Sequence, residues 1–197
     1  MLYHLQGVLI EKSPVHAVID CQGVGYHLNI SLNTYSSLPE PGQKCTLLTH
    51  LHINGNDFSL VLYGFGKETE RDIFRKLVSV SGVGPNTARM VLSSMNTNEI
   101  QHVIALKDVA SLKRIKGIGE KTAERIIIDL HDKIAKGNEI GTEKFLTPHN
   151  TLKNDALAAL SSLGLERTKT EKLLDKIQGQ SVDITLDELI KQVLKQL

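Results

Sequence analysis

The sequence has no tryptophan and only two cysteines, and its aromatic residues make up only 4% of the chain. It contains no run of about 18 apolar residues, so we expect no membrane-spanning helix. The N-terminus lacks a basic segment followed by an apolar stretch, and no signal peptide is expected. Cys21 and Cys45 show neither CxxC nor histidine spacing. We therefore expect reduced thiols in a cytoplasmic protein.

Signatures of common cofactor sites are also missing. None of the eight histidines is arranged as HxxxH or HExxH, so no metal site is predicted. Residues 117–122 read GIGEKT, which resembles a P-loop only superficially. A P-loop has glycine directly before the lysine, whereas Glu120 stands there and would repel a triphosphate. We expect no cofactor, and the sequence identifies no catalytic residue.

Charge is balanced overall but unevenly distributed. The net charge is +1, with 23 basic and 22 acidic residues. Residues 1–64 carry two basic and four acidic residues, whereas residues 65–142 carry 13 basic and ten acidic ones. Residues 143–197 hold eight of each. The positive excess therefore lies in the central segment, which is the part of the chain best suited to a polyanion.

Residues 1–64 alternate apolar and polar positions in short runs separated by glycine and proline turns. This pattern predicts five to six strands in a small barrel or sandwich. Asn54 and Gly55 form the sharpest hairpin signal, because a type I′ turn needs positive φ at both central residues. We expect this turn to join strands over residues 49–53 and 58–62.

From about residue 65 the period changes from two to 3.6, which predicts helices. The organising feature of this segment is a stretch that occurs twice, 35 residues apart: GVGPNTAR at 82–89 and GIGEKTAER at 117–125. Each copy lies between two helical patterns, so the sequence predicts helix–hairpin–helix twice. Pro85 suits a first helical turn, and Asn96 with Glu99 predicts a capping box that opens a further helix.

The C-terminal part is predicted to be a separate helical unit. Residues 136–151 show no period and are rich in glycine, proline and polar residues, which indicates a linker. Residues 152–197 then show three short amphipathic patterns. Thr168 with Glu171 and Thr185 with Glu188 predict capping boxes for the second and third helices. A small tethered helical domain of this kind is typical of docking modules.

The two glycine hairpins predict phosphate binding. Glycine permits positive φ and close approach, and a helix that starts after such a turn points unpaired amides and the positive end of its dipole outward. Nearby basic side chains would add charge-assisted contacts, and binding would be independent of sequence and sensitive to salt. The predicted DNA-binding residues are Gly82, Val83, Gly84, Asn86, Thr87, Arg89, Gly117, Ile118, Gly119, Lys121, Thr122 and Arg125.

Two other functions fit the same pattern. Helix–hairpin–helix units also occur in DNA-processing enzymes that use an aspartate downstream of the hairpin, and Asp129 and Asp132 follow the second hairpin here. Both are expected on the solvated face of a helix, which favours a non-catalytic role. A general adaptor that binds any duplex through its centre and protein through its tail is the third interpretation.

Several motifs together resemble the RuvA family over essentially the whole chain. They are MLYHLQG at 1–7, LYGF at 62–65, GVGP at 82–85 and KGIGEKTAER at 116–125. The resemblance implies a multidomain α+β protein: an OB-fold barrel at 1–64, a tandem helix–hairpin–helix domain at 65–142, a flexible linker at 143–149, and a three-helix, UBA-like domain at 150–197.

The resemblance also implies a function. Members of the family bind four-way (Holliday) junction DNA in recombination, DNA repair and the SOS response to DNA damage. They form a homotetramer through the barrel, hold the junction open and square-planar, and recruit the hexameric ATPase RuvB, while hydrolysing nothing themselves. It is open whether one tetramer or two, an octamer, enclose the junction. The RuvC resolvase is a further candidate partner.

Two departures from the family pattern bear on the site. The family presents an acidic pin, usually two adjacent acids, on the last barrel hairpin, whereas residues 54–57 read Asn54, Gly55, Asn56 and Asp57 here. We expect Asp57 alone to supply the charge of the pin. Many members also carry lysine at the positions of Asn86 and Glu120. We therefore expect glycine-exposed amides to contribute more to the grip than lysine charge does.

Overall fold

The structure, a computed structural model, describes residues 2–55, 57–137, 152–153, 155–157, 159–160, 165, 167–178 and 184–195. The chain divides into two compact units, Met1–Glu139 and Ile140–Leu197. Within the described residues no helix is long and apolar enough to cross a membrane. The linker predicted at 143–149 lies outside the described part of the chain.

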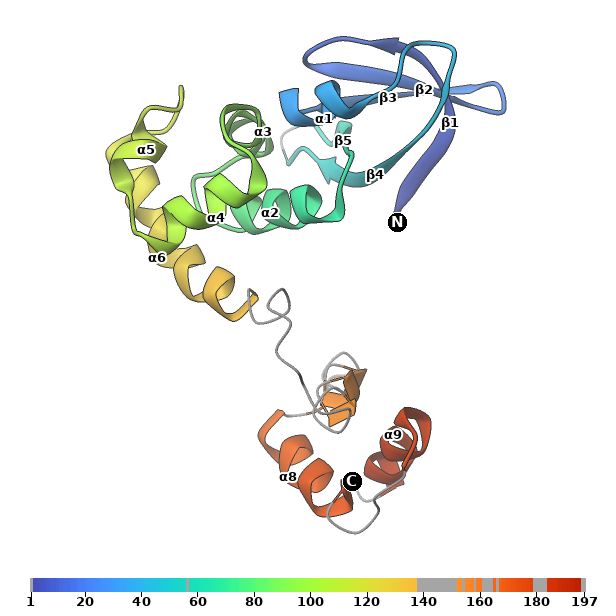
Figure 1. Cartoon of the computed structure of the whole chain (residues 1–197), viewed down its shortest axis with the longest axis vertical. Coiled ribbons are helices and arrows are strands. Elements are labelled where there is room, and N and C mark those ends of the chain that lie inside the picture. The colour runs from blue at the N-terminus through green and yellow to red at the C-terminus, as the bar shows by residue number, and fades with distance from the viewer. Residues whose placement is uncertain are drawn as a thin grey trace. The chain divides into compact units, whose positions relative to one another are not determined.

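Five strands of the first unit close into a barrel (Figure 1). They are β1 (His4–Lys12), β2 (His16–Cys21), β3 (Val24–Ile30), β4 (Lys44–Ile53) and β5 (Leu60–Phe65). The order around the barrel is β1-β2-β3-β5-β4, with β3 and β5 parallel and the other pairs antiparallel. A short helix, α1 (Leu32–Ser37), follows β3. The barrel confirms one of the two predicted architectures and excludes the sandwich.

The barrel closes over aliphatic side chains that alternate along its strands. Leu9, Ile19, Leu28 and Leu47 are all at most 1% exposed. Closure also requires a glycine in β1, because a Cβ atom on Gly7 would lie 2.0 Å from the backbone oxygen of β2. The apolar positions of the alternating pattern therefore form the barrel core, and Gly7 allows β1 and β2 to pass closely.

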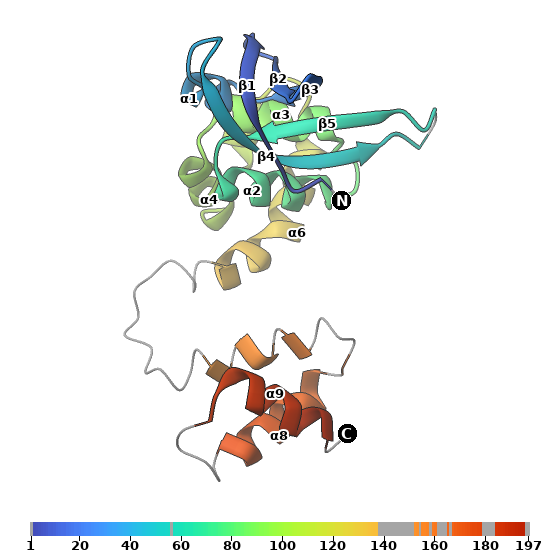
Figure 2. The same ribbon diagram turned by 90° about the vertical axis from the view of Figure 1, so that its right-hand side faces the viewer.

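The β4–β5 hairpin projects from the side of the barrel (Figure 2). Its strands stay paired as far as Ile53 and Leu60, and residues 54–59 connect them. Asn56 lies outside the described residues. The predicted hairpin is confirmed, and its length carries the connecting loop well beyond the barrel wall.

The predicted type I′ turn at this hairpin is wrong. The φ angle of Gly55 is not positive, and the left-handed residue is Phe58, with a φ of 55°. The loop is longer than two residues because the amide of Phe58 donates to the Asn54 carbonyl at 3.0 Å, and the amide of Asn54 donates to the Ser59 carbonyl at 3.0 Å. The second strand therefore begins at Leu60, two residues after its predicted start at residue 58.

Helices follow the barrel and pack on one continuous core. They are α2 (Glu68–Val78), α3 (Pro85–Ser94), α4 (Thr97–Ala105), α5 (Val109–Lys113) and α6 (Glu120–Gly137). Pro85 occupies the first turn of α3, as predicted. The capping box is also confirmed: the Glu99 amide donates to Asn96 Oδ1 at 3.0 Å, and the Asn96 amide donates to Glu99 Oε2 at 2.8 Å.

A buried carboxylate joins the helices to the barrel. Glu70 of α2 is 4% exposed and accepts hydrogen bonds from the hydroxyls of Ser31 and Thr34, the latter at 2.7 Å. Burial raises the pKa of Glu70, and the hydroxyl hydrogen bonds oppose that rise. Thr34 also accepts from the Gly66 amide at 3.2 Å, so the network spans the junction between β5 and α2.

Two further contacts fix the same interface. The guanidinium of Arg71, itself 1% exposed, donates to the Tyr3 hydroxyl at 3.0 Å and lies over the Tyr3 ring. From the barrel side, Asn33 donates to the carbonyls of Leu92 at 2.6 Å and Met95 at 3.0 Å, at the end of α3. The barrel and the helices of the first unit are therefore joined by directional bonds as well as apolar packing.

The second unit is helical at most of the residues that the structure describes, and Leu165, Ile184 and Thr185 are the described residues outside its helices. Its helices α8 (Arg167–Gln178) and α9 (Leu186–Lys195) follow helical residues between 152 and 160. Leu160, Leu174, Leu189 and Val193 are fully buried and form part of its core. Thr185 and Glu188 exchange the two capping-box hydrogen bonds, each at 3.4 Å, which confirms the predicted start of the last helix.

Candidate nucleic-acid interface

The two glycine hairpins have the same backbone geometry. Gly82 has a φ of 87° and Gly117 a φ of 90°, which side-chain-bearing residues adopt at a cost. A residue later, the Val83 amide donates to the Val80 carbonyl at 3.0 Å, and the Ile118 amide donates to the Ile115 carbonyl at 3.1 Å. The repeat seen in the sequence is therefore a repeat in structure.

The aliphatic residue of each hairpin anchors the turn. Val83 is 4% exposed and Ile118 is 5% exposed, and both belong to the core shared by the helices. Because their amides are also used within the turn, neither the side chain nor the amide is available to a ligand. We infer that Val83 and Ile118 position the residues that follow, and their contact with DNA stays a prediction.

The available donors lie at the starts of α3 and α6. The Ala88 amide bonds the Gly84 carbonyl at 3.0 Å, and the Ala123 amide bonds the Gly119 carbonyl at 2.9 Å, which closes the first turn of each helix. The amides that precede these bonds have no intrahelical acceptor. No side chain caps the start of α3, and Pro85 supplies no amide there.

In the first hairpin the outward donors are therefore the amides of Gly84, Asn86 and Thr87. In the second they are those of Gly119, Glu120, Lys121 and Thr122. These residues are exposed or half-buried, and the positive ends of two helix dipoles lie behind them. Both copies therefore have the backbone geometry on which the predicted anion site depends.

Side-chain charge differs between the two copies. At the 35-residue offset, Lys121 corresponds to Asn86, and both are exposed. Lys116, directly before Gly117, is also exposed, whereas its counterpart Ser81 is uncharged. Lys116 was not among the predicted site residues, although its place beside the hairpin glycine was a usable signal. The second hairpin is therefore the more basic one.

The two predicted arginines do not occupy equivalent positions. Arg125 donates to the carbonyl and hydroxyl of Ser81, each at 3.4 Å, and so links the second motif to the first hairpin. Arg89 instead donates to the Val15 carbonyl at 3.0 Å and to Asn29 Oδ1 at 3.1 Å, both on the barrel. Arg89 thus fixes the barrel beside α3, and its predicted phosphate contact does not follow from this geometry.

Glu120 is accommodated by a neighbouring lysine. Its carboxylate lies 3.2 Å from the ammonium of Lys113, and the side chains are 65% and 43% exposed, respectively. An exposed pair of this kind contributes little to stability. It does offset the negative charge beside the hairpin amides, where an unpaired carboxylate would oppose an approaching phosphate.

Asp57 lies near the tip of the projecting hairpin and is fully exposed. Its Oδ1 accepts from the Ser59 amide at 3.0 Å and from the Ser59 hydroxyl at 2.8 Å. The backbone and then the side-chain hydrogen bond of Ser59 hold the pKa of Asp57 below its ordinary value. The carboxylate is therefore charged at neutral pH and held in one place.

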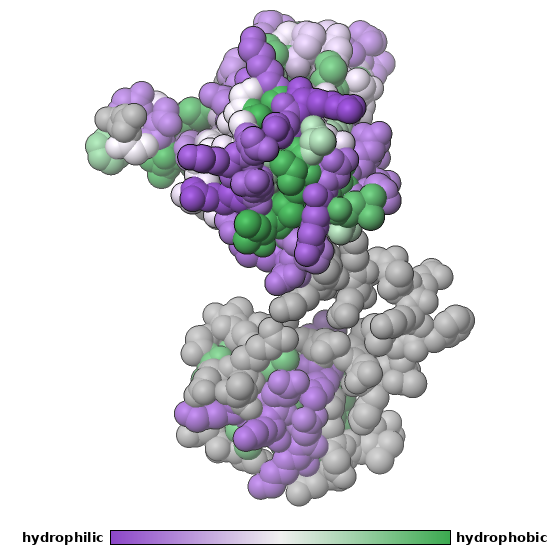
Figure 3. Space-filling model, turned by 90° about the vertical axis from the view of Figure 1, so that its left-hand side faces the viewer, coloured by the Kyte–Doolittle hydropathy of each residue, from purple (hydrophilic) through white to green (hydrophobic). Residues whose placement is uncertain are grey.

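An aromatic side chain stands next to this carboxylate. Phe58 is 78% exposed, and Ile53 and Leu60 on the hairpin stem are 56% and 67% exposed. The lobe that carries them stands clear of the rest of the unit (Figure 3). A left-handed conformation costs a residue such as Phe58 roughly 1–2 kcal/mol. Phe58 was not among the predicted site residues, although an apolar residue in a polar hairpin tip was a visible signal.

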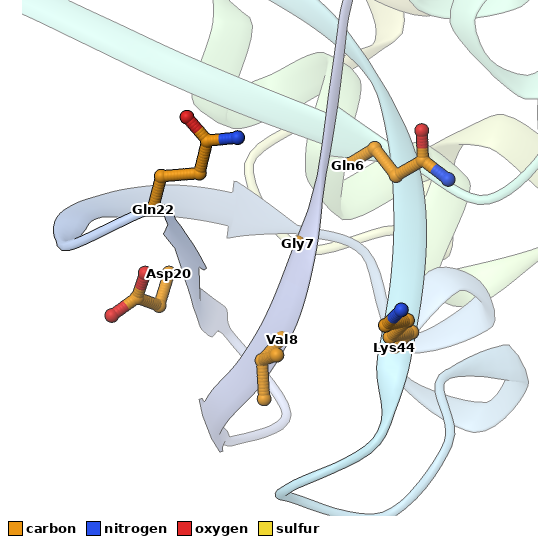
Figure 4. Close-up of a pocket in the computed structure, with 6 residues that line it drawn as sticks. All are labelled: Gln6, Gly7, Val8, Asp20, Gln22 and Lys44. Atoms are coloured by element: carbon orange, nitrogen blue, oxygen red, sulfur yellow. The ribbon is translucent and has the colours of Figure 1, made fainter.

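A shallow recess on the barrel is lined by polar side chains from β1, β2, β4 and the turn between β2 and β3. Asp20 and Lys44 lie on opposite sides of β1, and Gln6 and Gln22 point away from the floor formed by Gly7 (Figure 4). The groups do not converge on a common point. Among the described residues no cluster of three histidine, cysteine or acidic side chains could hold a metal ion.

The closed barrel and the paired hairpins define a nucleic-acid-binding protein of the tandem helix–hairpin–helix class. Comparison with known families agrees region by region. Residues 1–64 match the RuvA N terminal domain, 74–132 the SAM-like helix-hairpin-helix tandem, and 151–197 the RuvA C-terminal domain. This chain belongs to the RuvA family, and its barrel is accordingly an OB-fold.

Whole-length relatives support the same assignment. The chain is 46% identical over 199 residues to a protein of Christiangramia forsetii and 47% identical over 197 residues to one of Flavobacterium psychrophilum. Both matches cover 100% of each chain. A Cytophaga hutchinsonii protein is 42% identical over 99% of each chain. All three are named Holliday junction branch migration complex subunit RuvA.

Proposed function

We propose that this chain is the junction-binding subunit of a branch-migration complex. It recognises four-way DNA junctions by their shape, holds them open and square-planar, and recruits an ATP-driven motor of the RuvB type. It acts in the cytoplasm and has no catalytic step of its own. The observation that carries the proposal is the pair of equivalent hairpins on one rigid unit that also bears a projecting acidic loop.

The hairpins supply the grip on duplex DNA. Outward amides at the starts of α3 and α6 bind phosphate oxygens, and Lys121 and Lys116 add charge on one side. Backbone contacts of this kind position a protein without reading bases. Arg125 links the two hairpins through Ser81, so the two phosphate sites keep a fixed separation. One such unit therefore suits one duplex arm.

The projecting hairpin supplies the junction-specific element. Four chains assembled through their barrels would bring four Asp57 carboxylates together at the centre of a four-armed DNA, a match of symmetry between protein and ligand. The ionised carboxylates repel phosphates and keep the strands apart. One tetramer suffices for this arrangement, and a second on the opposite face of the DNA would give an octamer.

The remaining regions complete the assignment. Residues 1–64 form the assembly barrel, 65–142 the DNA-binding domain, and 150–197 the domain that docks on the motor, with 143–149 as the tether between them. A small helical core with a capping box at Thr185 and Glu188 supports an independently folding docking module. The RuvC resolvase is a further partner that can share the same junction.

Binding to a synthetic four-way junction in competition with linear duplex of equal length tests this function. We expect the junction to be preferred, native mass spectrometry to detect four or eight chains per junction, and the motor ATPase to be stimulated only when residues 150–197 are present. Equal affinity for junction and duplex would refute junction recognition. Asp57→Asn should weaken branch migration; an unchanged rate would remove Asp57 from the pin.

A further inference from the structure

We infer that Phe58 stacks on a nucleobase at the open centre of the junction, so that the hairpin tip combines a carboxylate with an aromatic platform. The inference rests on the proposed function, because it needs the projecting hairpin to reach the point where the DNA arms meet. Phe58 is 78% exposed and lies between Asp57 and Ser59, whose hydrogen bonds fix the loop.

The backbone at Phe58 argues against an incidental side chain. Its φ of 55° is a conformation that glycine or asparagine adopts readily and that a bulky residue adopts rarely. The loop needs this conformation, because the Phe58 amide closes the turn onto the Asn54 carbonyl at 3.0 Å. An exposed aromatic ring at a position suited to glycine points to a role for the ring, since strain of this kind accompanies function.

A nucleobase fits this ring better than an apolar protein surface does. The neighbouring Asp57 carboxylate is fully exposed, and burying it in an apolar contact would remove its water without providing a partner. Unpaired bases offer both a flat apolar face and amino groups that donate to a carboxylate. Asp57 and Phe58 together can therefore contact the edge of one base and the face of another.

The same geometry gives selectivity for junctions. Bases within a linear duplex are stacked on their neighbours and present no free face to a side chain. At the crossover point the strands separate, and a hairpin that projects beyond the barrel reaches faces that are otherwise covered (Figure 2). Ring stacking should therefore strengthen binding to the open junction and leave binding to linear duplex unchanged.

The absence of tryptophan from the sequence makes the test direct. Phe58→Trp places a single indole at the tip, and stacking on a base quenches indole fluorescence. We expect quenching when this full-length variant binds a four-way junction and none when it binds linear duplex. Leu60→Trp, on the exposed stem of the same hairpin, is the control and should change little in either complex. Unquenched fluorescence of Phe58→Trp in a formed junction complex would overturn the inference.

Affinity measurements on three further variants separate stacking from folding. Phe58→Gly relieves the positive φ, so its melting temperature should equal or exceed that of the wild type, yet its preference for junctions should fall by roughly 5- to 150-fold for each ring that stacks. Phe58→Tyr should retain the preference, and Phe58→Leu should lose it. Loss of the tetramer in Phe58→Gly would instead assign the ring to contacts between chains and refute stacking. A wild-type protein without junction preference would refute the proposed function itself.

Discussion

Replacing Lys121 by asparagine gives the second hairpin the side chain that the first hairpin carries at Asn86. Lys121 is exposed in the first turn of α6, beside the amides that we assign to phosphate binding. A lysine in the first turn opposes the helix dipole, so its removal should not destabilise the fold. The substitution therefore removes one charge from the candidate interface while leaving the backbone donors and the fold in place.

The expected size of the effect follows from counterion release. Each phosphate contact contributes about 0.9 to the slope of log K against log salt concentration. Lys121→Asn should therefore flatten the slope by about 0.9 for each chain bound, or about 3.6 for four chains on one junction. Between 50 and 200 mM salt, the affinity advantage of the wild type should shrink about 3.5-fold for each lost contact.

Fluorescence anisotropy of a labelled four-way junction over this salt range measures the slope directly. Lys133→Asn is the matched control, because Lys133 is exposed on the same helix about three turns away and its loss changes the net charge identically. Asn86→Lys should steepen the slope by the amount that Lys121→Asn flattens it. Equal slopes for Lys121→Asn and Lys133→Asn would refute a phosphate contact at Lys121 and leave only a general charge effect.

Three other predictions test the neighbouring groups. Gly117→Ala and Gly23→Ala each place alanine in a backbone of similar positive φ, and neither Cβ atom would clash with a neighbour. Each substitution should therefore lower the unfolding free energy by about 1 kcal/mol. Only Gly117→Ala should weaken junction binding in anisotropy titrations. Glu120→Gln frees Lys113 from its partner and should steepen the salt slope, and an added Lys113→Gln should cancel that gain. Burial raises the pKa of Glu70. The contribution of Glu70 to the unfolding free energy is therefore greatest below about pH 4.3 and declines as the pH rises through the folded-state pKa. In urea titrations between pH 4 and 8, the wild type should lose more unfolding free energy than Glu70→Gln does.

Local signals predicted most of the fold. Strand alternation predicted the barrel core, and the capping box of Asn96 and Glu99 predicted the start of α4, because both depend on residues close together in the chain. The doubled glycine motif likewise predicted two equivalent turns, since positive φ is a property of the glycine itself. The hairpin at residues 54–59 is the exception. There an Asn-Gly pair favours a two-residue turn, but hydrogen bonds across the longer loop determine the conformation.

Side-chain roles at the site were predicted less well, because they depend on distant partners. Arg89 and Arg125 both follow a Thr-Ala pair, yet one contacts the barrel residue Asn29, 60 positions away, and the other contacts Ser81, 44 positions away. At the 35-residue offset Arg89 corresponds to Glu124, so the two arginines differ by one position in the repeat, but the sequence does not show which partner either of them reaches. The pairing of Glu120 with Lys113 also depends on how α5 packs beside α6. A basic residue near a hairpin is therefore only a candidate for a phosphate contact, because the packing of the fold decides where its side chain points.

The contacts that hold Arg89 against the barrel also bear on how the proposed site would act as a whole. Arg89, Asn33 and the buried Glu70 each bond across the boundary between barrel and helices. They hold the hairpins and the projecting loop in one unit, so the distance from the phosphate sites to the tip at Asp57 is fixed before DNA arrives. In the proposed function, a four-way junction reaches the hairpins and the tip together when its arms are spread, whereas a linear duplex reaches the hairpins alone. We therefore expect selectivity for the open junction to depend on the contacts at the barrel–helix boundary, and loosening that boundary should reduce junction preference while leaving duplex binding intact.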